Sequence, residues 1–224
     1  MIVSSVSVIT VASHQRAAKA IAEGRFREQI LPLSVKRGRS ETMFDTDEHV
    51  RSDVTLEDLG KLRPAFDRDG SVTAGNASGI NDGAAALVLM NAATAADRGI
   101  AALARIVSYG LGGVAPEVMG LGPVPAVRQA LARAGLGISD MDVIESNEAF
   151  AAQACAVSEE LGFPEDKTNP NGGAVALGHP IGASGAILLV KLVYELRRIG
   201  GRYGLVTMCI GGGQGIAVVI ENAA

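Results

Sequence analysis

Residues 205–221 read LVTMCIGGGQGIAVVIE, and this stretch decides the fold. Apolar runs of strand length, Leu205 to Ile210 and Gly215 to Ile220, flank three glycines, which predicts two final strands joined by a glycine turn. A phosphate-binding P-loop is disfavoured, because strand-like residues follow the glycines and the Lys-Ser/Thr pair is lacking. We therefore expect a sheet that the preceding elements join or cover.

Helix and strand patterns alternate in the residues before this hairpin. Strands are expected over residues 84–90, 103–109 and 142–145, and helices over residues 92–98, 124–134, 147–161 and 183–199. Such alternation predicts the α/β class, with helices on the faces of a sheet. The pattern from residue 103 onward is that of one complete layered unit.

The first hundred residues are less regular and resemble parts of a second unit. The sequence predicts an alanine-rich helix over 13–23, an irregular edge strand over 30–35, a charged surface excursion over 36–53 and a short helix starting at Thr55. Residues 1–10 lack the basic n-region of a signal peptide, and no element or role is expected for them.

Composition narrows the class of protein. A length of 224 residues allows one large domain or two small ones. The net charge of −4 leaves no excess of Lys and Arg to neutralise nucleic-acid phosphates, so no nucleic-acid partner is expected. No apolar run approaches the roughly 20 residues of a membrane span, and the two cysteines fit a reducing compartment, so a cytoplasmic location without membrane contact is expected.

Three polar islands lie at junctions between the expected elements. They are NEAF at residues 147–150, NGGAVALGHPIG at 171–182 and CIGGG at 209–213. Ligand sites in α/β sheets gather at the carboxyl ends of strands. All three islands fit that placement, and they are the candidates for chemistry.

Each island also has a purely structural interpretation. Cys209 can be a small buried hydrophobe, although the glycines after it would let backbone N–H groups form an oxyanion hole. His179 can be a surface loop histidine, although the Gly and Pro beside it would hold it as a general base or oxyanion donor. Asn147 can be only the N-cap of the helix expected over 147–161, with Glu148 favourable toward the helix dipole.

The remaining cysteine and histidines predict no site. Cys155 lies among alanines in the middle of an expected helix, where a packing role is the simplest interpretation. His14 and His49 are expected to be solvated. No metal site is expected, because no Cys or carboxylate stands at ligand spacing from these histidines.

Together these segments resemble the thiolase family, and within it the acetyl-CoA C-acetyltransferases. The matching stretches are SHQRAAKAIAEGRF at 13–26, KLRPAF at 61–66, VTAGNASGINDGAAA at 72–86, VMGLGPVPA at 118–126, SNEAFAAQ at 146–153, NGGAVALGHPIGASGA at 171–186 and CIGGGQGIA at 209–217. The resemblance runs from about Val11 to the C-terminus. It implies a thiolase-like layered fold with helices around a mixed β-sheet.

The resemblance implies catalytic roles for four residues. His179 would activate the nucleophilic cysteine and contribute to the oxyanion hole for the thioester enolate. Cys209 would take a methyl proton from the second acetyl-CoA and return a proton to the leaving thiolate. Asn147 would hold a water that completes the oxyanion hole, and Gly211 would offer its backbone N–H to the thioester intermediate. A Claisen condensation needs such a base and a place for enolate charge.

The resemblance also implies a site for coenzyme A, which is substrate and product, so no separate cofactor is expected. Arg51, Ala65, Phe66 and Ser78 match positions along the CoA tail. Met119 and Phe150 match the acyl and pantetheine pocket.

The sequence departs from the family pattern in its N-terminal part. The family's acyl-enzyme cysteine and a second pocket histidine precede the matched segments, and neither has a counterpart here; Cys155 stands in a different context. Residues 11–82 are therefore expected to be a partial loop (CoA-binding) domain, 83–102 a remnant of a largely missing N-terminal domain, and 103–224 a complete C-terminal domain. Orphaned pieces of this kind would expose apolar surface.

By resemblance, the activity is the reversible conversion of two acetyl-CoA into acetoacetyl-CoA and CoA. The chain alone is expected to be inactive, because two-step ping-pong chemistry requires the nucleophile. A 3-ketoacyl-CoA thiolase of longer chain specificity and a non-catalytic CoA-binding protein are the alternatives. The expected partners are acyl-CoA and either a homo-oligomer or full-length thiolase subunits.

Overall fold

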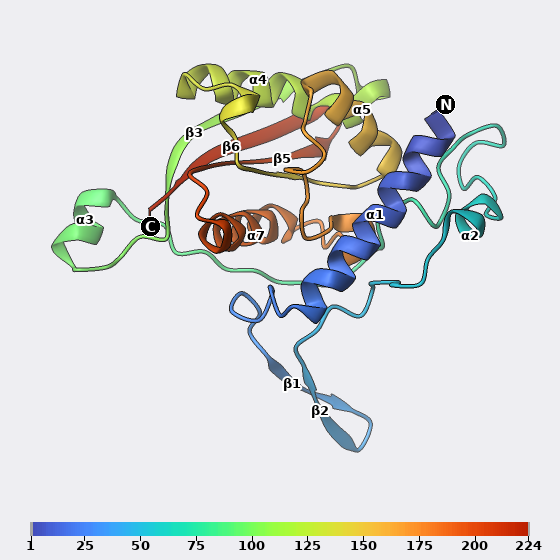
Figure 1. Cartoon of the computed structure of the whole chain (residues 1–224), viewed down its shortest axis with the longest axis horizontal. Helices are drawn as coiled ribbons and strands as arrows, with labels where there is room; N and C mark the ends of the chain where they lie inside the picture. The colour runs from blue at the N-terminus through green and yellow to red at the C-terminus, as the bar shows by residue number, and fades with distance from the viewer. Residues whose placement is uncertain (1, 224) are drawn as a thin grey trace.

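A four-stranded mixed sheet forms the centre of the computed structural model, which describes residues 2–223 (Figure 1). The strands are β3 (Ala104–Gly113), β4 (Val143–Ser146), β5 (Tyr203–Gly211) and β6 (Gln214–Asn222), in the order β3-β6-β5-β4. β6 runs antiparallel to β3 and β5, whereas β4 and β5 are parallel. The expected mixed sheet is confirmed, and all its strands lie within residues 104–222.

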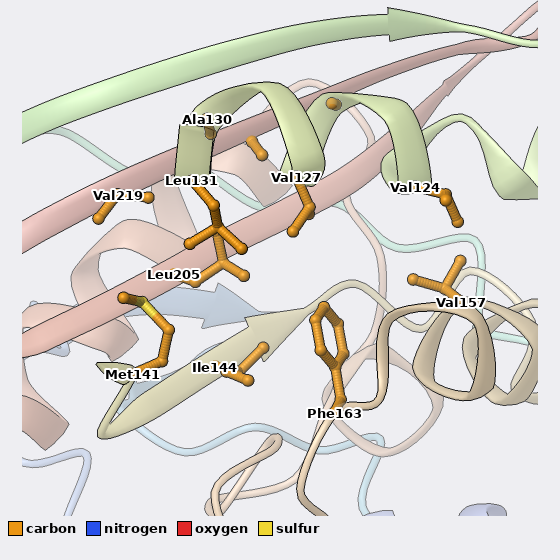
Figure 2. Close-up of a cluster of buried hydrophobic side chains, with 12 residues drawn as sticks. Val124, Val127, Ala130, Leu131, Met141, Ile144, Val157, Phe163, Leu205 and Val219 are labelled. Atoms are coloured by element: carbon orange, nitrogen blue, oxygen red, sulfur yellow. The ribbon is translucent and has the colours of Figure 1, made fainter. Parts of the chain in front are cut away.

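Helices cover both faces of this sheet. α4 (Pro123–Ala134) and α5 (Ala151–Leu161) lie on one face, and α7 (Ser184–Ile199) lies on the other (Figure 1). Successive side chains of a strand point to opposite faces, so Leu205 of β5 packs toward α4 while Val206 packs toward α7. Figure 2 shows Leu205 beside Leu131 of α4.

The glycine turn predicted from residues 205–221 joins β5 to β6. Gly211, Gly212 and Gly213 have φ values of 98°, 60° and 94°. Residues other than glycine rarely adopt these backbone conformations. The turn therefore explains the three consecutive glycines and needs no bound phosphate.

α1 (Ile2–Ala22) is longer than the helix expected over 13–23, because it includes most of the first ten residues. It packs against α5 and against α6 (Ala174–Leu177), with Val6, Ala17 and Ala20 buried. Small alanines on this face allow close approach of the helices. α1 thus connects the first part of the chain to the unit built on the sheet.

The charged surface excursion expected over 36–53 contains regular structure that the sequence did not predict, because part of it belongs to a protruding hairpin. β1 (Leu33–Arg37) pairs with β2 (Ser40–Phe44) around Gly38, whose φ is 66° (Figure 1). Every residue of β2 is exposed, so no face of the strand selects for apolar residues and no period appears in the sequence. The short helix predicted after Thr55 is confirmed as α2 (Leu56–Gly60), capped by the Thr55 hydroxyl, which accepts from the Asp58 N–H at 3.2 Å.

The strand expected over 84–90 does not form. These residues have no regular secondary structure, and Val88 and Leu89 are 85% and 71% exposed. A strand needs the N–H and C=O groups of a neighbour, and within residues 2–223 no strand pairs with this segment. The next element, α3 (Ala92–Asp97), forms as predicted. No helix within residues 2–223 has the length and hydropathy to cross a membrane.

Candidate active site

Asn147 and Cys209 lie at the same edge of the sheet. Asn147 directly follows β4, and its backbone N–H donates to the Thr207 carbonyl of β5 at 2.9 Å. Cys209 lies two residues further along β5, near the carboxyl end of that strand. Because β4 and β5 are parallel, their carboxyl ends meet at one edge, which is where the polar islands were expected.

A short loop between α6 and α7 brings His179 to this edge. The His179 Nε2 lies 3.3 Å from the Asn147 Nδ2, and its Nδ1 lies 2.6 Å from the Ser184 Oγ. The His179 backbone N–H donates to the Asn81 Oδ1 at 3.1 Å. The ring is therefore fixed at both nitrogens and at its backbone, unlike a mobile surface histidine.

Asn147 is not a helix N-cap, and the helix expected over 147–161 begins only at Ala151. The loop of residues 76–78 forms backbone hydrogen bonds with residues 149–151, where the chain passes from Asn147 into α5. The Ser78 N–H donates to the Ala149 carbonyl at 3.0 Å, and the Ala151 N–H donates to the Asn76 carbonyl at 2.9 Å. This pairing keeps the intervening residues extended. The Asn147 side chain is left free for His179.

The N-cap interpretation expected Glu148 to interact with the start of the helix. Its side chain binds other groups instead. Its buried carboxylate accepts from the Ser13 Oγ at 2.7 Å, the Asn169 Nδ2 at 2.8 Å and the Val175 N–H at 3.3 Å. The Ser13 hydroxyl in turn accepts from the Gly173 N–H at 2.9 Å. Glu148 therefore joins α1 to the loop that precedes His179.

Burial sets the protonation states of the two candidate reactive groups. It lowers the pKa of His179 below that of a free imidazole, and it raises the pKa of the Cys209 thiol. At neutral pH the site therefore holds a neutral imidazole, which can accept a proton, and a protonated thiol, which can donate one.

Several residues expected at the substrate lie beside this edge. Phe66 and Phe150 make an edge-to-face ring contact with centroids 6.1 Å apart, and Phe66 is 78% exposed. The Ala65 N–H donates to the Val72 carbonyl at 2.8 Å, and Ser78 bonds the backbone next to Phe150. The exposed Phe66 ring therefore lies next to Phe150, which follows shortly after Asn147, the residue in contact with the His179 ring.

The other expected residues are more widely placed. Gly211 lies in the turn between β5 and β6, and Met119 lies in the 3-10 helix η1 (Pro116–Leu121), which packs against α5 and β5. Arg51 lies beside α1, where its backbone N–H donates to the His14 Nδ1 at 3.0 Å. The structure thus groups Arg51 with His14 rather than with the Phe66–Phe150 ring contact.

The expectation that His14 and His49 are solvated is wrong for His14, which is 3% exposed. The two rings stack with centroids 6.4 Å apart, and the His49 Nδ1 lies 3.0 Å from the Ala176 carbonyl. Burial, the neighbouring His49 and Arg51 lower the pKa of His14 to about 4. His14 is buried because it lies on the face of α1 that packs against the rest of the chain. The sequence of the helix alone does not show which of its faces is buried.

Sequence reasoning missed a buried ion pair near the site. The Lys191 Nζ of α7 lies 2.7 Å from the Glu145 Oε2 of β4 and donates to the Gly172 carbonyl at 2.6 Å. The signal was a lysine within an apolar helix and a glutamate within an apolar strand. Among residues 2–223 no cluster of His, Cys, Asp and Glu could hold a metal ion, and Cys155 is half-buried within α5.

Two models of known protein families match this chain. Residues 100–222 match the model of the thiolase C-terminal domain, and residues 6–93 match that of the thiolase N-terminal domain. The second match begins at residue 6, within the stretch for which the sequence predicted no element.

Individual relatives agree with the family match. The chain is 60% identical to the beta-ketothiolase BktB of Cupriavidus necator over 94% of this chain and 54% of that protein. It is 56% identical to an acetyl-CoA acetyltransferase of Escherichia coli over 94% of this chain and 53% of that protein. The chain thus spans about half the length of the curated relatives it matches.

Solved structures share the fold. The Bacillus anthracis acetyl-CoA acetyltransferase matches with a TM-score of 0.95 and 49% identity over 97% of this chain and 55% of that chain. Human mitochondrial 3-ketoacyl-CoA thiolase, solved in complex with CoA, matches with a TM-score of 0.89 and 44% identity over 97% of this chain and 54% of that one. The chain therefore belongs to the thiolase family.

Proposed function

We propose that this chain carries the Claisen half of an acetyl-CoA acetyltransferase site, in which Asn147, His179, Cys209 and Gly211 act on a CoA thioester. The observation that supports it most directly is the contact between the Asn147 amide and the His179 ring at the sheet edge where β5 presents Cys209. The relatives named acetyl-CoA acetyltransferase supply the substrate class.

The chemistry follows from the groups present. Transfer of the Cys209 proton to His179 Nε2 would create a thiolate base and an N–H donor in one step. The thiolate would remove a proton from the methyl carbon of acetyl-CoA, and the electron pair would move onto the thioester oxygen, where the His179 N–H would stabilise it. The enolate carbon would then attack an acyl thioester, and the Cys209 thiol would protonate the thiolate that leaves. The proton held at His179 Nε2 would return to the Cys209 thiolate and restore the starting state.

The attacked acyl thioester belongs to the other half of the cycle. In the family, a cysteine that has no counterpart among Cys155 and Cys209 holds the acyl group, so we propose that this chain does not complete the cycle by itself. Residues 11–82, 83–102 and 103–224 would act as partial loop domain, N-domain remnant and C-terminal domain. Arg51, Ala65, Phe66 and Ser78 would contact CoA, and Met119 and Phe150 the acyl and pantetheine part.

Exchange of the acetyl-CoA methyl protons with deuterated solvent tests this proposal, because exchange needs enolate formation and no acyl-enzyme. We expect the chain to incorporate deuterium into acetyl-CoA, as read by mass spectrometry. The Cys209→Ala and His179→Ala variants should lose the incorporation, and Cys155→Ala should retain it. Absence of exchange by the unaltered chain, or equal exchange by Cys209→Ala, would contradict the proposal.

A second candidate function is supported by the exposed segment Leu87–Met90. Its four side chains are between 40% and 85% exposed, which favours burial against another thiolase chain. In that case the chain would be a non-catalytic CoA-binding subunit. Calorimetry with CoA and co-elution with a full-length thiolase would support it, and failure of both would contradict it.

Preference for longer 3-ketoacyl-CoA substrates is tested by repeating the exchange assay with longer acyl chains.

A further inference from the structure

Ser184 stands at the start of α7 with its hydroxyl between two groups. The side chain is buried, with 4% of the residue exposed. Its Oγ lies 3.0 Å from the Pro180 carbonyl oxygen and 2.6 Å from the His179 Nδ1. The hydroxyl therefore links the catalytic ring to the backbone of the loop that carries it.

The direction of these two hydrogen bonds follows from the groups involved. A carbonyl oxygen only accepts, so the single proton of the Ser184 hydroxyl is donated to Pro180. The hydroxyl oxygen must then accept at its second contact. The His179 Nδ1 is accordingly the donor, which means that it carries the ring proton.

The opposite side of the ring gives the same assignment independently. The Asn147 Nδ2 is an amide nitrogen and only donates, so the His179 Nε2 at 3.3 Å must accept and carries a lone pair. A neutral imidazole has one protonated nitrogen. The contacts at Nδ1 and at Nε2 therefore agree on a single tautomer.

We propose that Ser184 is a positioning residue that holds His179 in the tautomer protonated at Nδ1, so that Nε2 is the proton acceptor of the site. The catalytic meaning of this tautomer rests on the proposed function, but the tautomer itself does not. A proton accepted at Nε2 leaves the Nδ1–H to Ser184 bond intact. The same proton ends the hydrogen bond from the Asn147 Nδ2 and makes Nε2 the donor that an enolate oxygen requires.

A hydroxyl suits this position better than a carboxylate. Neither of the two ring contacts described for His179 involves a charged side chain. A carboxylate at Nδ1 would favour the imidazolium and occupy the base, whereas a neutral hydroxyl orients the ring without adding charge. The lowered pKa of His179, which is due to burial, agrees with a neutral resting ring.

The loop geometry makes this arrangement rigid. The Pro180 carbonyl also accepts from the Ser184 N–H at 2.9 Å and from the Ala183 N–H at 2.8 Å. The first turn of α7 thus closes back onto the residue next to His179. The hydroxyl is held at a fixed distance from the ring by the helix itself.

The test uses the full chain labelled with ¹⁵N at histidine and long-range ¹H–¹⁵N correlation at pH 8. The chain has three histidines, so His14→Gln and His49→Gln variants assign the His179 signals. We expect Nδ1 protonated and Nε2 unprotonated in the unaltered chain. We expect Ser184→Ala to weaken this preference, so that the Nε2-protonated tautomer becomes detectable beside the one that the Asn147 contact still favours, and Ser184→Thr, which keeps the hydroxyl, to restore it.

Two results would overturn the proposal. One is an Nε2-protonated His179 in the unaltered chain, which needs no variant and stands even if Ser184→Ala fails to fold. The other is an unchanged Nδ1 tautomer in folded Ser184→Ala. The spectrum is independent of the deuterium-exchange assay, so a chain with the expected tautomer and no exchange would refute the proposed function and leave the role of Ser184 standing.

Discussion

Replacing Lys191 with methionine should lower the free energy of unfolding by about 3 to 5 kcal/mol, the range for breaking a buried ion pair at one partner. Glu145 is 0% exposed and Lys191 is 5% exposed, with 2.7 Å between the Nζ and the Oε2. Loss of the ammonium leaves the carboxylate without a counter-charge where water has no access. Burial already raises the pKa of Glu145 and Lys191 opposes that rise, so protonation of Glu145 limits the loss at low pH.

The double variant decides whether the effect is electrostatic. The Glu145 Oε1 has no hydrogen-bond partner, so Glu145→Met removes one unpaired buried atom together with the charge. Two apolar side chains of similar volume in place of a buried ion pair are often neutral or even stabilising. We therefore expect Glu145→Met/Lys191→Met to be more stable than Lys191→Met, with a coupling free energy of at least about 2 kcal/mol.

Urea unfolding followed by far-UV circular dichroism measures all four members of the cycle, provided that the m-value stays constant. Lys19→Met is the matched control, because Lys19 is an exposed lysine whose ion pair with Glu23 spans 3.9 Å, and it should change stability by less than about 0.5 kcal/mol. Additive effects of the two single variants would refute the reasoning, since they would mean that Glu145 and Lys191 do not stabilise one another.

Three further predictions concern other parts of the molecule. Because the pKa of His14 is about 4 in the folded chain and 6.5 otherwise, the unfolded state binds more protons between these values. Stability should fall by up to about 3 kcal/mol as pH drops from 6.5 to 4, and urea midpoints of His14→Gln should lack that part of the decline. Gly173→Ala should destabilise by about 1 to 3 kcal/mol, because its Cβ would overlap the Glu148 carboxylate, whereas Gly182→Ala meets no atom within 4 Å and should have little effect in thermal melts. Cys209 should react with iodoacetamide far more slowly in the native chain than in urea, since it is buried and its thiol pKa is raised; rapid native modification in peptide mass spectrometry would contradict this.

The parts of the fold that could be predicted are those where local pattern and tertiary burial agree. The residues around the 205–221 hairpin alternate between two buried faces, and α7 carries apolar residues along the side that packs on the sheet. The sequence did not predict the strand β2, and it wrongly predicted a strand over 84–90. The two errors have opposite causes. β2 buries no face and so has no pattern, whereas 84–90 has the pattern without a neighbouring strand.

The candidate site shows a similar division. The contexts of Asn147, His179 and Cys209 are visible in the sequence as polar islands and in the family resemblance. Ser184 lies within the matching stretch 171–186, but the sequence predicts no role for it, because a serine at the start of a helix is common and only the position of the His179 ring gives it one. His14 was misjudged because its burial depends on how α1 packs, which local pattern does not specify.

The loop that delivers His179 depends on elements far apart in the chain. Residues 171–173 at its base are held by Lys191 of α7 at the Gly172 carbonyl, by Ser13 of α1 at the Gly173 N–H, and by Arg25 at the Asn171 Oδ1 with 2.8 Å between the atoms. Two of these three partners lie before residue 26. Although residues 104–222 contain the whole four-stranded sheet, they contain only one of these three supports, Lys191. The geometry of His179 is therefore a property of the first and last parts of the chain together, and removal of α1 should displace the ring even where the sheet remains folded.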